Sequence, residues 1–111
     1  MSEDPAIVVL VTAGSAESAG EIGRAVVAER LVACVNVIPG VRSIYRWQGR
    51  ITDEGECLLV MKTRRSSFAA LEARIREIHP YDVPEVIALD VALGSAPYLD
   101  WLLSETRGAS G

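Results

Sequence analysis

The sequence is poor in the residues that most often carry catalysis. Among its 111 residues there are one histidine and two cysteines, and only 5% are aromatic. Nucleophilic catalysis needs a nucleophile beside a base, and His79 is the only imidazole in the chain. Neither Gly-x-Ser-x-Gly nor Gly-Lys-Ser/Thr occurs, so the common nucleophile and phosphate-loop signatures are absent. We therefore expect a protein that binds a ligand and is not an enzyme.

A basic surplus and a long apolar run are missing as well. Asp and Glu number 15 against 11 Lys and Arg, which gives a net charge of −4, whereas nucleic-acid binders usually carry a basic footprint. The apolar run 6–11 is far shorter than the roughly 20 residues that cross a bilayer. The acidic start 1–5 does not resemble a signal peptide. We expect no nucleic-acid partner, no membrane and a cytoplasmic location.

The cysteine spacing argues against a closed zinc site within one chain. Cys34 and Cys57 do not form a Cys-x-x-Cys pair. Both lie in apolar runs that resemble strands, where a free thiol behaves as a small hydrophobe, and in a reducing cytosol they should remain thiols. One alternative stays open, in which the Cys34 thiolate joins the same residue of neighbouring subunits, or His79, to hold Cu(I).

The sequence does contain a regular succession of apolar patterns. Runs rich in β-branched residues predict strands, and apolar residues at helical spacing predict helices. Pro39-Gly40, Gln48-Gly49 and the segment 53–55 have the composition of turns. The strands are predicted at 7–12, 32–38, 41–47, 56–63 and 86–93, and the helices at 16–30, 68–79 and 98–104.

This order predicts an α+β fold: a ferredoxin-like βαββαβ sandwich with a short C-terminal helix. The stretch 32–63 would form a long hairpin arm, and both long helices would cover one face of the sheet. We expect one domain over 1–111 with its core at about 6–104. The strand at 32–38 is apolar on both alternations, so the second face of the sheet should be buried by oligomerisation.

The densest polar and aromatic cluster is the segment 79–85, His-Pro-Tyr-Asp-Val-Pro-Glu. Two prolines stiffen this loop, and a rigid loop that carries His79, Tyr81 and Glu85 suits a binding site. The same residues also have a purely structural explanation, because Pro80 would end the helix and Pro84 would begin the strand.

Five short patterns, in this order, resemble the CutA family of divalent-cation tolerance proteins, and the similarity runs from about Ile7 to Leu103. The patterns are Ala33-Cys34-Val35-Asn36, Tyr45-x-Trp47-x-Gly49, Glu56 with Lys62-Thr63, His79-Pro80-Tyr81 with Pro84-Glu85, and Tyr98-x-x-Trp101. The resemblance implies a tight homotrimer in which the hairpin arm around Trp47 reaches a neighbour. It also implies an association with tolerance to copper and other divalent metals, and in mammalian relatives with anchoring of acetylcholinesterase.

The resemblance further implies the residues of a site near a subunit interface. Cys34 and His79 are the candidate metal ligands, for copper or another divalent cation, and no organic cofactor is implied. Two positions depart from the family pattern: Gln48 stands where Glu is common, and Cys57 stands where a plain apolar residue is usual. The implied pocket residues are Tyr45, Trp47, Glu56, Lys62, His79, Tyr81 and Glu85.

Three functions follow from these features. The first is a trimeric divalent-metal (copper) tolerance or response protein that binds metal ions. The second is a sensor similar to the PII signalling proteins, which would bind a small anion or metabolite between subunits where Lys62, His79 and Tyr81 meet. The third is a structural scaffold for a protein partner that the sequence does not identify.

Overall fold

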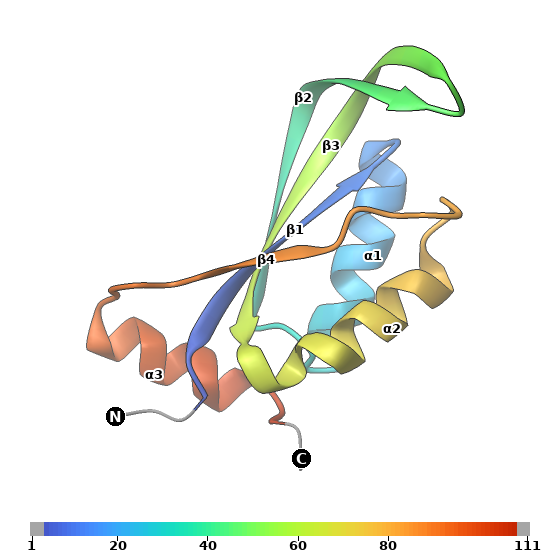
Figure 1. Ribbon diagram of the computed structural model, residues 1–111. Helices are drawn as coiled ribbons and strands as arrows, with labels where there is room; N and C mark the ends of the chain where they lie inside the picture. Colours follow the sequence, from blue (N-terminus) through green and yellow to red (C-terminus); the bar gives the residue numbers. More distant parts are fainter. Residues whose placement is uncertain (1–3, 109–111) are drawn as a thin grey trace.

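Four antiparallel strands and three α-helices make up the computed structural model, which describes residues 4–108. The strands form one sheet in the order β2-β3-β1-β4. This order, with α1 and α2 as the crossovers, confirms the predicted ferredoxin-like fold (Figure 1). The elements are β1 (Ala6–Ala13), α1 (Ala16–Ala28), β2 (Cys34–Trp47), β3 (Arg50–Arg64), the short 3-10 helix η1 (Arg65–Ser67), α2 (Phe68–Ile78), β4 (Ile87–Asp90) and α3 (Ala96–Glu105).

The core lies between α1, α2 and one face of the sheet. Along β1 every second residue is buried, beginning with Ile7, as expected for a strand with one covered face. The C-terminal half of β3 repeats this alternation from Cys57 to Thr63. The helices contribute side chains at helical spacing, so the apolar stripe of each helix meets the sheet. These helical residues are Ala19, Ile22, Val26, Leu71 and Ile75.

Both ends of α1 have identifiable causes. The Ser15 hydroxyl accepts a hydrogen bond from the backbone N–H of Ser18 at 3.1 Å, which caps the first turn. The helix ends at Ala28 and not at Arg30 as predicted, because Arg30 adopts a left-handed conformation with φ of 61°. The N–H of Leu31 then bonds the carbonyl of Val26, which is the Schellman arrangement that closes many helices.

The hairpin of β2 and β3 extends beyond the rest of the molecule. The two strands pair from Cys34 opposite Lys62 to Trp47 opposite Arg50. The connecting residues Gln48 and Gly49 have φ of 50° and 77°, the backbone of a two-residue hairpin turn, so the turn predicted here is confirmed. The longest axis of the molecule measures 46 Å, and the arm forms its upper part in Figure 1.

Two other predicted turns are wrong, because they lie inside continuous strands. Ile38 pairs with Leu58 and Val41 pairs with Glu56, so Pro39 and Gly40 together face the single residue Cys57. This is a β-bulge, and Gly40 supplies the positive φ of 78° that it needs. Residues 53–55 pair with β2 throughout. Pairing between strands outweighs local turn propensity at both places.

The last strand is shorter than predicted. Only residues 87–90 form β4, whereas the apolar pattern predicted a strand over 86–93. The ladder ends here because the N–H of Val91 bonds the carbonyl of Ala6, and Ala6 is the first residue of the partner strand β1. The chain then crosses to α3, which packs against the end of the sheet where the Arg64 guanidinium bonds the Leu103 carbonyl.

The second face of the sheet is apolar and largely uncovered in this chain. Its central residues Val8, Leu10 and Val60 are only partly buried, and the β4 side chains Ile87 and Leu89 are 51% and 56% exposed. Direct pairing of Val8 with Leu89 and of Leu10 with Ile87 puts these residues on one face. The predicted uncovered apolar face is confirmed, and its burial by other copies of the chain stays a prediction.

Candidate functional site

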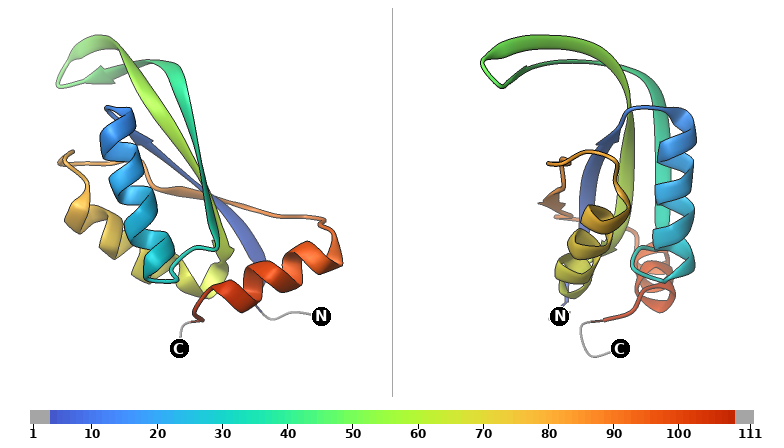
Figure 2. Two further views of the ribbon diagram at one scale, coloured as in Figure 1. Left: turned by 180° about the vertical axis from the view of Figure 1, so that it is seen from behind. Right: turned by 90° about the vertical axis from the view of Figure 1, so that its right-hand side faces the viewer.

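A cleft of about 600 Å³ lies where the arm meets the loop between α2 and β4. In both views of Figure 2 the arm rises above the end of β1 and above this loop. The arm provides one wall of the cleft, and the loop together with the end of β1 provides the other. The arm contributes Ser43, Ile44, Tyr45, Trp47, Glu54 and Glu56, and the opposite wall contributes Thr12, Tyr81, Asp82, Val83 and Glu85.

The β-bulge sets which residue numbers of β2 fall on the face that lines the cleft. Before the bulge, Ile38 lies directly opposite Leu58, and after it Ser43 lies opposite Glu54. The single surplus residue moves the odd-numbered residues of β2 to the side of Glu54 and Glu56. Tyr45 and Trp47 therefore stand on the same face of the arm as these two carboxylates.

Two tyrosine–carboxylate hydrogen bonds organise the cleft. The Tyr81 hydroxyl donates to Glu56 Oε2 at 2.7 Å, and the Tyr45 hydroxyl donates to Glu54 Oε1. Burial, and then the hydrogen bond to Glu56, raise the pKa of Tyr81 well above its ordinary value. The hydrogen bond to Glu54 raises the pKa of Tyr45 to about 12. Both phenols are therefore neutral donors at neutral pH.

His79 stands behind Tyr81 and fixes the loop. Its Nε2 lies 2.7 Å from the carbonyl oxygen of Thr12, and its Nδ1 accepts the N–H of Tyr81 at 3.1 Å. Because a carbonyl only accepts, Nε2 carries the proton and the ring is the neutral tautomer. The two rings lie 4.6 Å apart. Gly14 leaves room for the phenol, since a Cβ there would lie 3.1 Å from the Tyr81 hydroxyl oxygen.

The cleft has a negative lining. Four of its residues are carboxylates, Glu54, Glu56, Asp82 and Glu85, and no Lys, Arg or His is among the described residues that line it. Arg42 forms an ion pair with Asp53 at 2.6 Å, but the pairing of the strands puts both on the opposite face of the arm. A cation that enters the cleft thus meets carboxylates that no lining cation neutralises.

The carboxylates are spread out. Within residues 4–108, no three His, Cys, Asp or Glu side chains come together closely enough to hold a metal ion. Glu54 and Glu56 are two positions apart on one strand, which corresponds to about 7 Å along it, and Asp82 and Glu85 come from the opposite wall. One chain by itself therefore offers no closed inner-sphere metal site among the described residues.

The structure brings together five of the residues that the sequence predicted for the site. These five line the cleft, and His79 supports one of them from behind. Cys34 and Lys62 lie opposite each other near the other end of the sheet, and Lys62 is also paired with Val8. The five residues in the cleft are Tyr45, Trp47, Glu56, Tyr81 and Glu85.

The two predicted metal ligands lie apart within one chain. His79 bonds the carbonyl of Thr12, four residues along β1 from Val8, which corresponds to about 13 Å. The Cys34 thiol is half-buried, and its hydrogen-bond partner is Asn36 Oδ1 at 3.9 Å. Lys62 also donates to that oxygen. Cys57, which departs from the family pattern, is buried in the core.

Sequence reasoning missed several residues of the cleft. Glu54 could have been predicted, because it is two residues before Glu56 and lies on the same face in any continuous strand. The interpretation of 53–55 as a turn prevented that prediction. Asp82 and Val83 follow Tyr81 directly, but no pattern showed that they reach the cleft. The other lining residues that were missed are Thr12, Ser43 and Ile44.

Comparison with known proteins identifies the family. The family model described as CutA1 divalent ion tolerance protein matches residues 7–105. The chain belongs to the CutA1 family. A divalent-cation tolerance protein CutA of Thermus thermophilus is 50% identical over 99 residues, which cover 89% of this chain and 96% of that protein. Human protein CutA is 48% identical over 100 residues, which cover 90% of this chain and 56% of the human protein.

Solved CutA1 structures share the fold. A Thermus thermophilus Cut A1 structure superposes with a TM-score of 0.90 at 49% identity, covering 92% of this chain and 99% of that one. CutA1 from Oryza sativa gives a TM-score of 0.90 at 44% identity, with 93% and 94% coverage. The chain spans 54% to 62% of the plant and animal relatives that it matches.

The relatives come from more than one compartment. Two plant relatives are named chloroplastic, and a similar structure from Archaeoglobus fulgidus is described as a periplasmic divalent cation tolerance protein. None of the helices within residues 4–108 of this chain has the length and apolar character needed to cross a membrane.

Proposed function

We propose that this CutA1-family protein is a homotrimer that contributes to divalent-cation tolerance by binding cations, and that it is not a catalyst. The observation that carries the proposal is the cleft, with four carboxylates and no basic side chain among its described lining residues. Like charges at this density attract a cation and disfavour an anion. The negative lining therefore favours a cation over the small anion expected for a PII-like sensor.

Hard divalent cations suit the oxygen donors of the cleft. Carboxylates and waters are the ligands that Mg²⁺ and similar ions take, and Mg²⁺ keeps several of its waters. An ion that retains waters does not need three convergent side chains from one chain. Glu54 and Asp82, on opposite walls, are the proposed contacts for such an ion.

Copper remains the proposed cargo of a second kind of site. Cys34 lies on the strand face that carries Lys62 and Val8, which is the apolar face that this chain leaves uncovered. In a trimer that buries this face, the same thiol of neighbouring subunits would approach, and soft thiolates select Cu(I). This assignment needs no contact between Cys34 and His79.

The proposed trimer rests on the uncovered face and the projecting arm. The face joins Val8, Leu10 and Val60 to the half-exposed β4 side chains Ile87 and Leu89. Apolar patches of this kind mark interaction sites, and closed symmetric assemblies are the usual outcome for identical chains.

Binding without catalysis is supported by the state of the nucleophiles. Both ring nitrogens of His79 are engaged with the backbone of Thr12 and Tyr81. The Cys34 thiol bonds Asn36, and Cys57 is buried among apolar residues. We also propose a cytoplasmic location, which is supported by the two free thiols, since a reducing compartment keeps cysteines in this state.

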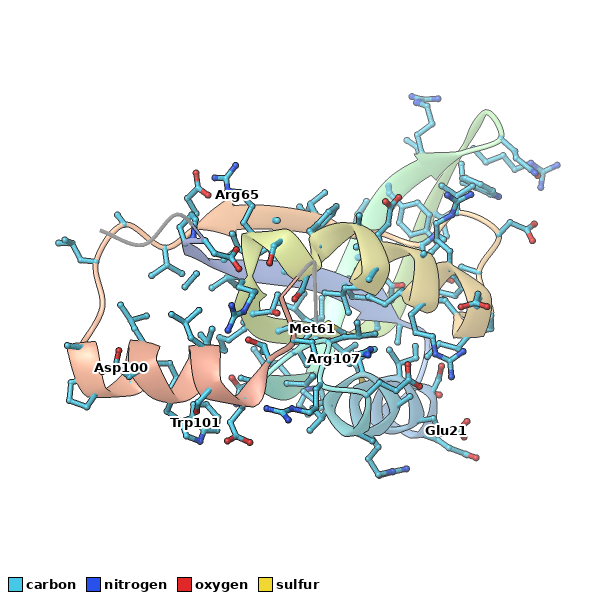
Figure 3. All side chains as sticks on the ribbon, turned by 90° about the horizontal axis from the view of Figure 1, so that it is seen from below. Glu21, Met61, Arg65, Asp100, Trp101 and Arg107 are labelled. Atoms are coloured by element: carbon cyan, nitrogen blue, oxygen red, sulfur yellow. The ribbon has the colours of Figure 1, made fainter. Side chains whose placement is uncertain are left out.

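Native mass spectrometry of the reduced protein tests these proposals together. We expect a trimer that takes up a fixed number of Cu(I) or Zn(II) ions. Glu54→Gln should lower the uptake of Zn(II) at the cleft, and Cys34→Ala should lower the uptake of Cu(I). Glu21→Gln should change neither. Glu21 is the matched control because it carries the same charge on the outer surface of α1 (Figure 3). A trimer that binds no metal would refute the metal-binding part, and a monomer would refute the assembly.

A further inference from the structure

The size of the cleft exceeds what a metal ion requires. Six waters around an ion occupy roughly 180 Å³ at about 30 Å³ each, whereas the cleft measures about 600 Å³. Sites for small organic ligands fall in the range of about 300–1,000 Å³. A hydrated ion would leave most of the cleft filled with water, so its volume points to a larger ligand.

Three aromatic rings line the same cleft, and a metal ion gains little from them. Tyr45 and Trp47 come from the arm and Tyr81 from the opposite wall. Trp47 is 45% exposed in the single chain, so a ligand that enters the cleft can reach its ring. An ammonium group is attracted to the face of such a ring, most strongly to Trp, and methylene groups attached to the nitrogen pack on the ring as apolar surface.

The carboxylates match a ligand whose positive charge is distributed. A metal ion that side chains bind directly needs donors that converge, and no three acidic, His or Cys side chains converge within residues 4–108. Glu54 and Glu56 each give one oxygen to a tyrosine hydroxyl, which fixes the direction of the carboxylate. The second oxygen of each can still accept a hydrogen bond. Asp82 and Glu85 offer negative charge on the facing wall.

We infer that the cleft binds an organic dication, a short methylene chain with an ammonium group at each end. One ammonium group would lie between the arm carboxylates and the aromatic rings, and the other would reach the loop carboxylates, while the methylene chain would pack on Trp47. The inference rests on the proposed binding of cations in this cleft and names the chemical class of the cation.

Isothermal titration calorimetry of the full chain tests the inference with diaminobutane. We expect diaminobutane to bind at least about tenfold more tightly than butylamine, which lacks the second charge, and butanediol not to bind. Glu54→Gln should weaken the binding of diaminobutane by roughly tenfold, because a charge-assisted hydrogen bond is lost. Glu21→Gln should leave the affinity unchanged. Equal affinities for diaminobutane and butanediol, or no effect of Glu54→Gln, would overturn the inference.

Tryptophan fluorescence locates the bound ligand. The chain has two tryptophans, and Trp101 projects from α3 at the other end of the molecule (Figure 3). In a Trp101→Phe background, diaminobutane should change the emission of Trp47 with the midpoint seen by calorimetry. If this variant does not fold, the wild-type emission measured against a Trp47→Phe variant gives the same readout. An emission that does not change at saturation would overturn the placement.

Parallel titrations with Zn(II) and Cu(I) separate this inference from the proposed function. If diaminobutane binds and the metals do not compete with it, the organic dication is supported. If a metal binds in a way that depends on Glu54 and diaminobutane does not bind, the inference fails and cation binding by the cleft stands. If neither binds, both fail.

Discussion

The hydrogen bond between Tyr81 and Glu56 gives a quantitative test of the site. It measures 2.7 Å, and Glu56 is only 8% exposed, so water has little access to replace a lost donor. Hydrogen bonds to charged groups contribute about 1.5–3 kcal/mol. We therefore expect Tyr81→Phe to lower the free energy of unfolding by about 2 kcal/mol. For a chain of this length, this is a fall of about 8 °C in Tm.

A double-mutant cycle isolates the bond itself. Tyr81→Phe, Glu56→Gln and the double variant are measured by chemical denaturation at one protein concentration, because assembly would also contribute to stability. We expect a coupling energy of about 1–2 kcal/mol. Tyr98→Phe is the matched control, because Tyr98 is a half-exposed residue of α3 that does not line the cleft. Loss of its hydroxyl should change the free energy of unfolding by less than about 0.5 kcal/mol. Equal effects of Tyr81→Phe and Tyr98→Phe would refute the reasoning.

The same bond predicts the response to alkali. The pKa of Tyr81 is raised in the folded protein by burial and by Glu56, while the pKa of an unfolded tyrosine is about 10. The unfolded state therefore loses its proton first, and stability is complete below pH of about 10 and falls as pH rises beyond it. Tyr45, with a pKa of about 12, acts in the same direction. Tyr81→Phe should make the fall shallower.

Three further predictions concern the arm and the N-terminal contact. Gly40→Ala should lower the free energy of unfolding by about 1–2 kcal/mol, because Gly40 has a φ of 78°, which strains any residue with a Cβ even where the space is open. The control is Gly55→Ala, where φ is not positive, and denaturation should find its stability nearly unchanged. Gln48→Asn should raise stability by about 0.5 kcal/mol, because Asn-Gly suits this turn, and a lower Tm would contradict the assigned backbone. Burial alone would raise the pKa of Asp4, but hydrogen bonds from Ser66 and Arg64 lower it below 3.8. The stability that Asp4 gives to the folded state is therefore present above pH 3.8 and is lost as pH falls further. Asp4→Asn should flatten this acid limb in a pH series.

The sequence predicted the elements and the covered face of the sheet well. Apolar periodicity reports burial directly, and the buried stripe on α2 agrees with it. β1 is apolar at nearly every position, so its alternation of burial was not visible in the sequence. The prediction failed at 39–40 and 53–55, where local composition favours a turn. The competing influence is the pairing of β2 with β3 over their whole length, which involves residues far apart in the sequence and leaves no local trace.

The site was predicted in part for a related reason. A family pattern supplies residues that are important, but it does not show which of them meet within one chain. Tyr81 and Glu56 do meet, whereas Cys34 and Lys62 lie near the other end of the sheet. Glu54 was missed because its strand was interpreted as a turn, and the two walls of the cleft come together only through the fold.

The β-bulge at Pro39 and Gly40 shifts by one residue the alternation of side chains between the two faces of β2. The odd-numbered residues after it line the cleft because two residues there oppose the single residue Cys57. A chain shortened by one residue at position 40 would keep Tyr45 opposite Thr52 in a regular ladder, with its ring over the cleft, but it would lose the local bend that a bulge introduces. Such a deletion separates two properties of the arm: the direction of its side chains would survive, and the curvature with which it overhangs the loop would not.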